Sequence, residues 1–247
     1  LVHGAERFAQ SVRITPEVVD MLHECAQLAP LHNPANILGI EAVTKVLPST
    51  PQVGVFDTAF HQTMPEHAYM YALPYEFYDK YRIRRYGFHG TSHDYVSAKG
   101  AEIAGLDRAS CKIVTAHIGS GASMAAVLNG KSIDTSMGLT PSEGLMMGTR
   151  AGDDSGVIEY LMNKKDYDPE FLAPFLKKAT PGKTHLDLED LTFLLTKKSG
   201  VAGISTQGSD MRDVAKAAEE GSERDRLALS MHAYRVKKYV GAYAAAL

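Results

Sequence analysis

The chain has 247 residues, of which 45% are hydrophobic and 22% are charged. This composition is typical of a globular protein with enough apolar material for one large domain or two smaller ones. The formal net charge of -3 shows no excess of basic side chains. Such an excess would be needed to neutralise a nucleic-acid backbone, so nucleic acid is not expected as a partner.

Membrane and metal signals are also missing from the sequence. No apolar run approaches the roughly 18 residues of a membrane-spanning helix, and no basic-then-apolar leader opens the chain. The two cysteines, Cys25 and Cys111, lie outside any zinc-binding spacing and are expected to be reduced. We therefore expect a cytoplasmic protein without a membrane partner. Because it opens on Leu1 and closes without a helix stop signal, the chain is expected to be cut at both ends.

Two helices are predicted near the start of the chain. Thr15-Pro16 offers an N-cap and a proline at the first helical position, and the helix is expected to run to about Ala29. Asn33-Pro34 repeats this start signal for a second helix that reaches about Leu47.

Strands are predicted next. The valine-rich run of residues 52–56 is expected to be a buried strand that delivers Asp57 at its C-terminal end, where α/β folds build their sites. Residues 112–118, 123–128 and 131–134 are also strand-like, and Asn129-Gly130 predicts a type I′ hairpin between the last two. The later third is predicted to be mostly helical, with start signals at Asp168-Pro169, Asp187 and Ser222.

Three stretches combine a histidine with groups that could hold a ligand. His32 lies just before a proline-started helix, whose free N–H groups could bind an anion, although this motif alone favours a turn histidine with an ordinary N-cap. Asp57 could serve chemistry or simply cap the following turn. Gly87 and Gly90 bracket His89, which suggests backbone approaching a ligand, while Thr91 or Ser92 could be no more than the N-cap.

A fourth pair of stretches suits phosphate. The glycine-bearing turn of residues 117–121 could cradle phosphates with backbone N–H groups, although a lone GxG is weak evidence. Arg150 lies between glycines, and a guanidinium held there suits bidentate contact with phosphate or carboxylate; a surface arginine is the alternative. No GxxxxGK[ST] segment is present, so a P-loop kinase is disfavoured.

Six segments together resemble the acetate and propionate kinase family in order and spacing along essentially the whole chain: LAPLHNP, VFDTAFHQTMP, YGFHGTSH, AHIGSGAS, NGKSIDTSMG and GLMMGTR. The resemblance implies the α/β fold of the actin-like superfamily of sugar kinases and heat-shock ATPases, with a ribonuclease H-like motif and two domains that close over a nucleotide. Residues 1–58 would be the C-terminal part of the first domain and residues 59–247 the second domain, with parts of both missing.

The resemblance also implies roles for individual residues. Asp57 would be the catalytic aspartate, and His89 and Arg150 would stabilise the transition state. The acyl group of acetate or another short-chain carboxylate would contact Val2, Leu31, Phe88 and Pro141, with His32 beside the transferring phosphoryl group. ATP or ADP would be bound by His117, Ile118, Gly119, Ser120, Gly121, Asp210, Met211 and Arg212.

The metal would be Mg²⁺, with Mn²⁺ as an alternative, and the family's metal ligands are expected outside this chain. The full-length protein is expected to be a homodimer. A propionate or other short-chain acyl kinase is the enzymatic alternative, and a non-catalytic fragment is the alternative of another class.

Three features depart from the family pattern. Ser120 stands where asparagine is usual, which removes one amide donor from the phosphate turn. Residues 152–156 lack the usual second acid and proline after Arg150. Residues 166–185 are longer than the usual connection and are expected to be a surface insertion.

Overall fold

A computed structural model describes residues 1–26, 28–29, 32–152 and 155–247. The chain divides into two compact units: residues 1–117, 123–141 and 240–247 form unit 1, and residues 118–122 and 142–239 form unit 2. Residues 59–117 thus share a compact unit with residues 1–58. The two units therefore do not coincide with the domains expected from the sequence, and the domain border after residue 58 stays a prediction.

Unit 1 begins with a small α/β layer. Strands β1 (Val12–Arg13) and β2 (Val53–Gly54) pair antiparallel, and α1 (Pro16–Cys25) and α2 (Asn33–Val46) pack beside them. The Thr15 side chain accepts from the Val18 N–H as the predicted N-cap. The apolar faces of these elements close over one core, formed by Phe8, Leu22, Cys25, Ile37 and Phe56.

Two details of this layer differ from the sequence prediction. Helix α1 ends at Cys25 rather than near Ala29. The strand expected over residues 52–56 is short, with β2 at Val53–Gly54 and a further hydrogen bond from the Ile14 N–H to the Gln52 oxygen at 2.9 Å. Val53 and Val55 are 64% and 45% exposed. The strand therefore has one open face, because side chains alternate between the two faces of a strand.

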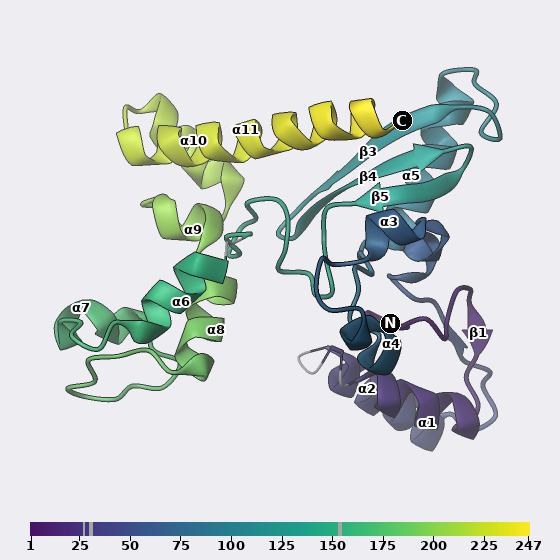
Figure 1. Ribbon diagram of the computed structural model, residues 1–247, viewed down its shortest axis with the longest axis horizontal. Helices are drawn as coiled ribbons and strands as arrows, with labels where there is room; N and C mark the ends of the chain where they lie inside the picture. Colours follow the sequence, from purple (N-terminus) through teal and green to yellow (C-terminus); the bar gives the residue numbers. More distant parts are fainter. Residues whose placement is uncertain (27, 30–31, 153–154) are drawn as a thin grey trace. The chain divides into compact units, whose positions relative to one another are not determined.

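The second part of unit 1 is a three-stranded sheet in the order β3-β4-β5, with β3 at Lys112–Ile118, β4 at Ala122–Leu128 and β5 at Lys131–Thr135. Figure 1 shows α5 (Gly90–Ile103) behind this sheet. Asn129 and Gly130 have φ angles of +52° and +76°. Positive values at both positions are what a type I′ turn requires, so the predicted hairpin is confirmed.

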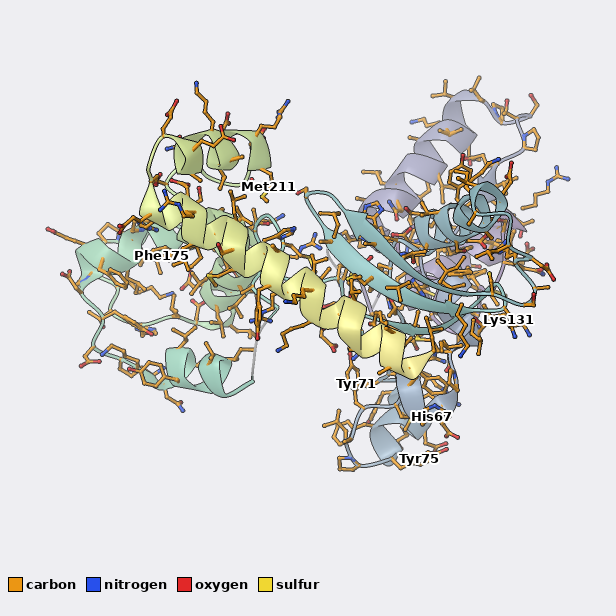
Figure 2. The ribbon with its side chains drawn as sticks, turned by 90° about the horizontal axis from the view of Figure 1, so that it is seen from above. His67, Tyr71, Tyr75, Lys131, Phe175 and Met211 are labelled. Atoms are coloured by element: carbon orange, nitrogen blue, oxygen red, sulfur yellow. The ribbon has the colours of Figure 1, made fainter. Side chains whose placement is uncertain are left out.

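Short elements join the two parts of unit 1. They are η1 (Ala59–Thr63), α3 (Glu66–Tyr69) and α4 (Glu76–Tyr81). Tyr71, which follows α3 and is labelled in Figure 2, accepts a hydrogen bond from the Leu139 N–H at 2.9 Å. This bond ties the segment after α3 to the loop that follows β5.

Unit 2 is mostly helical, as predicted for the later third of the chain. Asp187 caps α8 (Leu188–Lys197) with a capping box, and Asp168 caps α7 (Pro169–Leu172). One apolar cluster contains Met146, Val201, Val214 and Ala228, and another contains Leu172, Leu176, Leu186 and Leu191. The elements are α6 (Ser155–Asn163), α7 (Pro169–Leu172), η2 (Ala173–Phe175), α8 (Leu188–Lys197), α9 (Gly200–Ile204), α10 (Met211–Glu219) and α11 (Glu223–Ala246), the end of which belongs to unit 1.

The segment of residues 166–185 is more than the surface loop expected from the sequence. Leu172 and Leu176 are buried in the second cluster of unit 2, together with Leu186 and Leu191. The segment therefore folds onto α6 and α8 and contributes to the core of unit 2. Among the described residues, no helix is both long and apolar enough to cross a bilayer.

Candidate active site

The N-terminus of α5 lies against the predicted catalytic aspartate. The Gly90 N–H donates to the main-chain oxygen of Asp57 at 2.8 Å. The side chain of Asp57 accepts from the backbone N–H of His89, the residue that precedes the helix. His89 has a φ of +57°, in the left-handed region that few residues other than glycine adopt. The structure thus brings the predicted Asp57 and His89 together.

Burial raises the pKa of the Asp57 carboxyl above its ordinary value, although the His89 N–H and the nearby His117 imidazole act in the opposite direction. A carboxylate that accepts a helix N-terminal N–H is favoured by the helix dipole as well. Asp57 can therefore act as a fixed acceptor at the start of α5. This contact also gives Asp57 the capping role that the sequence left open.

His117 lies directly on His89. The two rings stack with 3.9 Å between centroids and 21° between planes. Nδ1 of His117 is 2.9 Å from the hydroxyl of Ser92, in the first turn of α5. Stacking and this hydrogen bond fix the ring of His117, which the resemblance assigned to phosphate contact, beside His89.

A hydrogen-bonded group of side chains behind His89 was not predicted. Nδ1 of His89 is 2.8 Å from the Ser123 hydroxyl, which is 2.7 Å from Nε2 of His93. Nδ1 of His93 is in turn 2.7 Å from Oγ1 of Thr115. The sequence carried a signal for it, because His89, Ser92 and His93 recur at helical spacing and Thr115 and His117 alternate on one face of a strand.

The glycines around His89 have a structural cause. A Cβ at Gly87, whose φ is +75°, would lie 2.3 Å from Cγ2 of Thr135, and a Cβ at Gly90 would lie 2.3 Å from the Asp57 oxygen. Packing within the protein therefore requires both glycines, and the approach of a ligand to this backbone stays a prediction. Thr91 and Ser92 are not the N-cap of α5, because that position is occupied by His89.

Two of the predicted acyl-contacting residues, Val2 and Phe88, lie beside His3. Val2 precedes it, and the Phe88 ring meets the His3 ring edge-on at 5.5 Å. Asn33, in the first turn of α2, accepts from the His3 N–H and donates to the His3 oxygen. His32 occupies the N-cap position of α2 without a side-chain cap. Pro141 is half-buried in the same unit, and Leu31 lies outside the described residues.

In unit 2 the predicted phosphate turn meets the loop that carries Arg150. The Gly148 N–H donates to the main-chain oxygen of Ser120 at 3.1 Å, and the Gly119 N–H donates to Gly121 at 2.9 Å. Ser120 itself is exposed. The two glycine-bearing motifs are therefore neighbours, although Ser120 and Gly148 are 28 positions apart in the sequence. The exposed Ser120 turn thus lies beside the loop that carries Arg150.

Arg150 is held rather than free on the surface. It is half-buried, its main-chain oxygen accepts from Met147 at 3.0 Å, and Nη1 lies 3.7 Å from the Met147 sulfur. Burial lowers the pKa of the guanidinium, which stays protonated because free arginine titrates far above neutral pH. Gly200, with a φ of +63°, packs against the Arg150 backbone. The alternative of an unconstrained surface arginine is not supported.

In the segment of residues 210–212, which is predicted to bind the nucleotide, Asp210 and Arg212 form an ion pair. Asp210 caps α10 by accepting from the Arg212 N–H, and its other oxygen is 2.6 Å from Nη2 of Arg212. This contact with Arg212 lowers the pKa of Asp210 to about 2. The Arg212 side chain is 90% exposed, and Met211 begins the helix.

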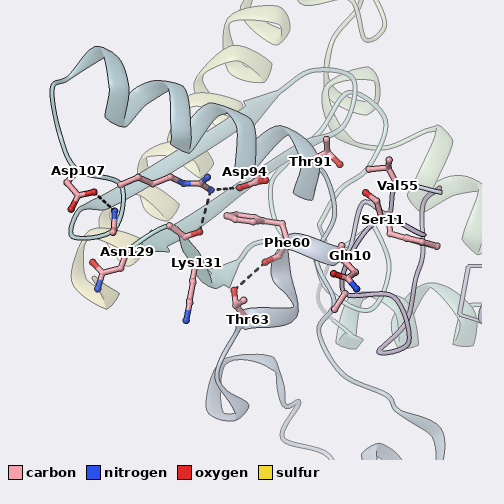
Figure 3. A pocket seen from close by; sticks show the side chains of 16 residues that line it. Gln10, Ser11, Val55, Phe60, Thr63, Thr91, Asp94, Asp107, Asn129 and Lys131 are labelled. Carbon is pink, nitrogen blue, oxygen red and sulfur yellow. Dashed lines mark hydrogen bonds and ion pairs between the residues drawn. The ribbon is translucent and has the colours of Figure 1, made fainter. Parts of the chain in front are cut away.

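Among the described residues, the predicted site residues form no metal-binding cluster, and they do not line the pocket shown in Figure 3. Within the described part of the chain, no group of three or more His, Cys, Asp or Glu side chains is arranged to hold a metal ion. The pocket, of about 880 Å³, lies between the residues before Asp57 and the β4–β5 turn. Asp94 and Arg108, which form an ion pair, both line it, and none of the predicted site residues does.

Solved structures match the whole chain. The crystal structure of Porphyromonas gingivalis acetate kinase matches with a TM-score of 0.86 and 55% identity, covering 100% of this chain and 57% of that chain. A propionate kinase from Francisella tularensis subsp. tularensis SCHU S4 matches with a TM-score of 0.87 and 42% identity, covering 100% and 59%. The chain therefore has the actin-like α/β kinase fold, and the predicted fold class is confirmed.

The family follows from the sequence comparison. The model of the acetokinase family matches residues 1–247, and the chain belongs to this family. Curated acetate kinases of Porphyromonas gingivalis (strain ATCC BAA-308 / W83) and Agathobacter rectalis are 55% and 54% identical to it over 248 residues. These matches cover 100% of the chain, which spans about 58% of the length of either relative.

Proposed function

We propose that these 247 residues belong to an acetate kinase, which reversibly transfers the γ-phosphoryl group of ATP to acetate and forms acetyl phosphate and ADP. One observation carries the proposal. In a chain that is 55% identical to a curated acetate kinase, the carboxylate of Asp57, the left-handed His89 and the stacked His117 converge at the start of α5. An enzyme that transfers a phosphoryl group to a carboxylate needs hydrogen-bond donors and acceptors that are fixed around the reacting groups.

The reaction needs charge stabilisation more than proton transfer. An acetate oxygen attacks the γ-phosphorus, the bond from phosphorus to the bridging oxygen breaks, and ADP leaves with the electron pair. Carboxylates are ionised near neutral pH, so no general base has to remove a proton. Negative charge spreads over the equatorial phosphoryl oxygens, and donors that are fixed in advance stabilise it. His89 and Arg150 suit this role.

The remaining predicted residues fill supporting roles in the proposal. Val2, Leu31, Phe88 and Pro141 would contact the acyl group, with His32 as a further donor. The turn of residues 117–121 and the segment 210–212 would bind the nucleotide. Mg²⁺, or Mn²⁺, when bound would neutralise phosphate charge. One or two carboxylates together with phosphate oxygens are a usual ligand set for Mg²⁺, and the carboxylates of that set would lie outside this chain, with Asp57 orienting the reacting groups.

The wider setting is proposed as well. We infer a cytoplasmic homodimer at the full length of the relatives, with a domain border after residue 58. The match to a propionate kinase at 42% identity favours propionate kinase as the second candidate. One methylene changes binding by only about 1–3 kcal/mol, so activity ratios across two- to four-carbon acids distinguish the two. Since the chain covers 58% of its relatives, we expect the 247 residues alone to have little or no turnover.

The test is acyl phosphate formation, trapped with hydroxylamine, by the full-length protein with ATP, magnesium and acetate. We expect activity in the wild type and a loss of at least about a hundredfold in Arg150→Ala, because a fixed transition-state donor contributes on this scale. Arg13→Ala is the matched control, since Arg13 is an exposed arginine in β1. Absence of acyl phosphate in the wild type, or equal activity in the Arg150→Ala and Arg13→Ala variants, would refute the proposal.

A further inference from the structure

The ring of His3 is enclosed within unit 1 and held in one orientation. It is 0% exposed. The rings of Tyr86 and Phe88 meet it at T-shaped angles, with centroids 4.6 and 5.5 Å away. Asn33 accepts from the His3 N–H at 3.1 Å and donates to the His3 oxygen at 2.9 Å. Backbone and ring of His3 are therefore both fixed.

One backbone contact assigns the proton on this ring. The Ala5 N–H donates to Nδ1 of His3 at 3.0 Å. A backbone N–H can only donate, so Nδ1 is the acceptor, and the proton of the neutral ring is on Nε2. Burial lowers the pKa of His3 to about 4, which keeps the ring neutral at physiological pH. His3 therefore has a single ring donor, the Nε2–H.

The Nε2–H of His3 has no hydrogen-bond partner among the described residues, although the atom is buried. The main chain of Leu139, which opposes the effect of burial on the pKa of His3, acts on the ring as a hydrogen-bond acceptor. Because Nδ1 already accepts from Ala5, the Leu139 oxygen faces Nε2, in a geometry short of a full hydrogen bond. Buried donors without a partner are rare and costly, so we expect this N–H to have a role.

The oxygen that faces His3 belongs to a segment, residues 138–141, that contains the predicted acyl contact Pro141. Another predicted contact, Phe88, directly follows Gly87. The Gly87 N–H donates to the main-chain oxygen at position 138 at 3.1 Å, so the backbone segments that carry Phe88 and Pro141 are joined. A shift of residues 138–141 would therefore change the space between these two contacts.

We propose that His3 is a positioning residue of the acyl pocket, and that its Nε2–H binds the Leu139 oxygen when residues 138–141 settle on an acyl group. His3 thereby limits the space between Phe88 and Pro141, and with it the length of the acyl group that fits. This inference deepens the proposed function and rests on it, because contact of Phe88 and Pro141 with the acyl group is part of that function.

His3→Asn and His3→Gln separate the two ring nitrogens. The amide of asparagine lies near the position of Nδ1, so it can accept from the Ala5 N–H, but it does not reach the position of Nε2. The amide of glutamine reaches the position of Nε2 and can donate there, while the acceptor for Ala5 is lost. Both variants remove the ring from Tyr86 and Phe88, so each is the control for the other's loss of packing.

The first readout is the ratio of kcat/KM for propionate to kcat/KM for acetate in the full-length protein, measured by hydroxylamine trapping. We expect His3→Asn to raise this ratio by about five- to tenfold, part of the roughly 10–200-fold that one methylene is worth, because Pro141 is no longer held. His3→Gln should change the ratio by less than about twofold, because its donor is retained. An unchanged ratio in His3→Asn, or equal shifts in the two variants, overturns the inference.

The second readout is backbone amide exchange in residues 138–140, measured without acetate and with acetate at a concentration that saturates each protein. Acetate should slow this exchange by at least about threefold in the wild type and in His3→Gln, and leave it unchanged in His3→Asn. Slowing in His3→Asn, or none in the wild type, overturns the inference. Exchange needs no turnover, so the expected pattern without acyl phosphate formation would refute only the proposed function.

Tyr71→Phe tests the same segment without altering the His3 ring. The Leu139 N–H donates to the Tyr71 hydroxyl at 2.9 Å, so removal of the hydroxyl loosens residues 138–141 at a second point. The propionate-to-acetate ratio should rise as in His3→Asn, and the double variant should show less than the product of the two changes, because coupled residues are not independent. Fully multiplicative effects, or no rise in Tyr71→Phe, would show that His3 does not act through this segment.

Discussion

The backbone of Gly90 lies in direct contact with the main-chain oxygen of Asp57. The Gly90 N–H donates to that oxygen at 2.8 Å, and a Cβ at Gly90 would lie only 2.3 Å from it. Backbone on both sides of the contact leaves no flexible side chain to move away. The position of the predicted catalytic aspartate therefore depends on the absence of a side chain at Gly90.

This contact predicts a large effect for Gly90→Ala. The methyl group should force α5 away from Asp57 and break the bonds from its first turn, so we expect a loss of activity of at least about a hundredfold, because misplacement by about 1 Å already costs this much. Gly100→Ala is the control in the same helix, since a Cβ there meets nothing within 4 Å. That variant should be more stable by up to about 1 kcal/mol. Equal activity of the two variants in the hydroxylamine assay would contradict the prediction.

Local signals in the sequence were sufficient for much of the fold. The Asn129-Gly130 hairpin, the Thr15 N-cap and the Asp187 capping box each depend on a few adjacent residues. The resemblance assigned Asp57 and His89 to one site, and the two residues lie in contact, while their catalytic roles stay a prediction. It did not indicate that Ser123 would join His89 to His93, because such a contact depends on how β4 packs against α5.

The glycines beside His89 show the same limit. They were interpreted as backbone that approaches a ligand, and the structure adds a packing cause, the contacts of Gly87 with Thr135 and of Gly90 with Asp57. Thr135 and Asp57 are distant in sequence from Gly87 and Gly90. A glycine requirement can be predicted from sequence, but the group that approaches it is known only from the fold.

Buried neutral histidines should make the stability of the protein depend on pH. Burial lowers the pKa of His61 to about 4, whereas in the unfolded chain it should be near 6.5. Between these values the unfolded state binds the additional proton, so stability rises with pH across this window and falls as the pH drops from 6.5 toward 4. At pH 5 this one group should cost roughly 2 kcal/mol relative to pH 8.

His61→Gln should therefore reduce the difference in unfolding free energy between pH 8 and pH 5 by about 2 kcal/mol. It should also lower stability at pH 8, because the Ser132 hydroxyl and the Phe88 carbonyl lose their ring partner. His185→Gln is the control, since His185 is exposed. Denaturant unfolding at the two pH values measures the difference, and an unchanged difference in His61→Gln would show that the ring is protonated in the folded state.

Asp225 should be a main determinant of how α11 begins. Its carboxylate is fully buried and accepts from the hydroxyls of Ser205, Thr206 and Ser222. These bonds lower its pKa, so its contribution to stability is present above the unfolded-state pKa near 4 and is lost as the pH falls below it.

Asp225→Ala should lower the melting temperature clearly at pH 7, because the three hydroxyls lose their common acceptor in a buried site. Part of this difference from the wild type should disappear at pH 3, because that pH lies below the unfolded-state pKa near 4 and above the lowered pKa of the folded state. Glu223→Gln, an exposed position in the same first turn, should have little effect at either pH. Thermal unfolding followed by circular dichroism at the two pH values is the measurement. A difference that is as large at pH 3 as at pH 7 would mean that the charge of Asp225 is unimportant.

The segment of residues 166–185 gives the last prediction, because its burial distinguishes a folded part of the core from a loop. Leu172 is 2% exposed and packs with Leu176, Leu186 and Leu191, whereas Leu188, at the start of α8, is 67% exposed. Truncating a buried leucine removes its transfer free energy and leaves a cavity, which together cost about 2–5 kcal/mol. Leu172→Ala should therefore destabilise the protein by this amount, and Leu188→Ala by less than about 0.5 kcal/mol. Similar small losses in the two variants, measured by denaturant unfolding, would show that the segment behaves as the surface insertion first expected from the sequence.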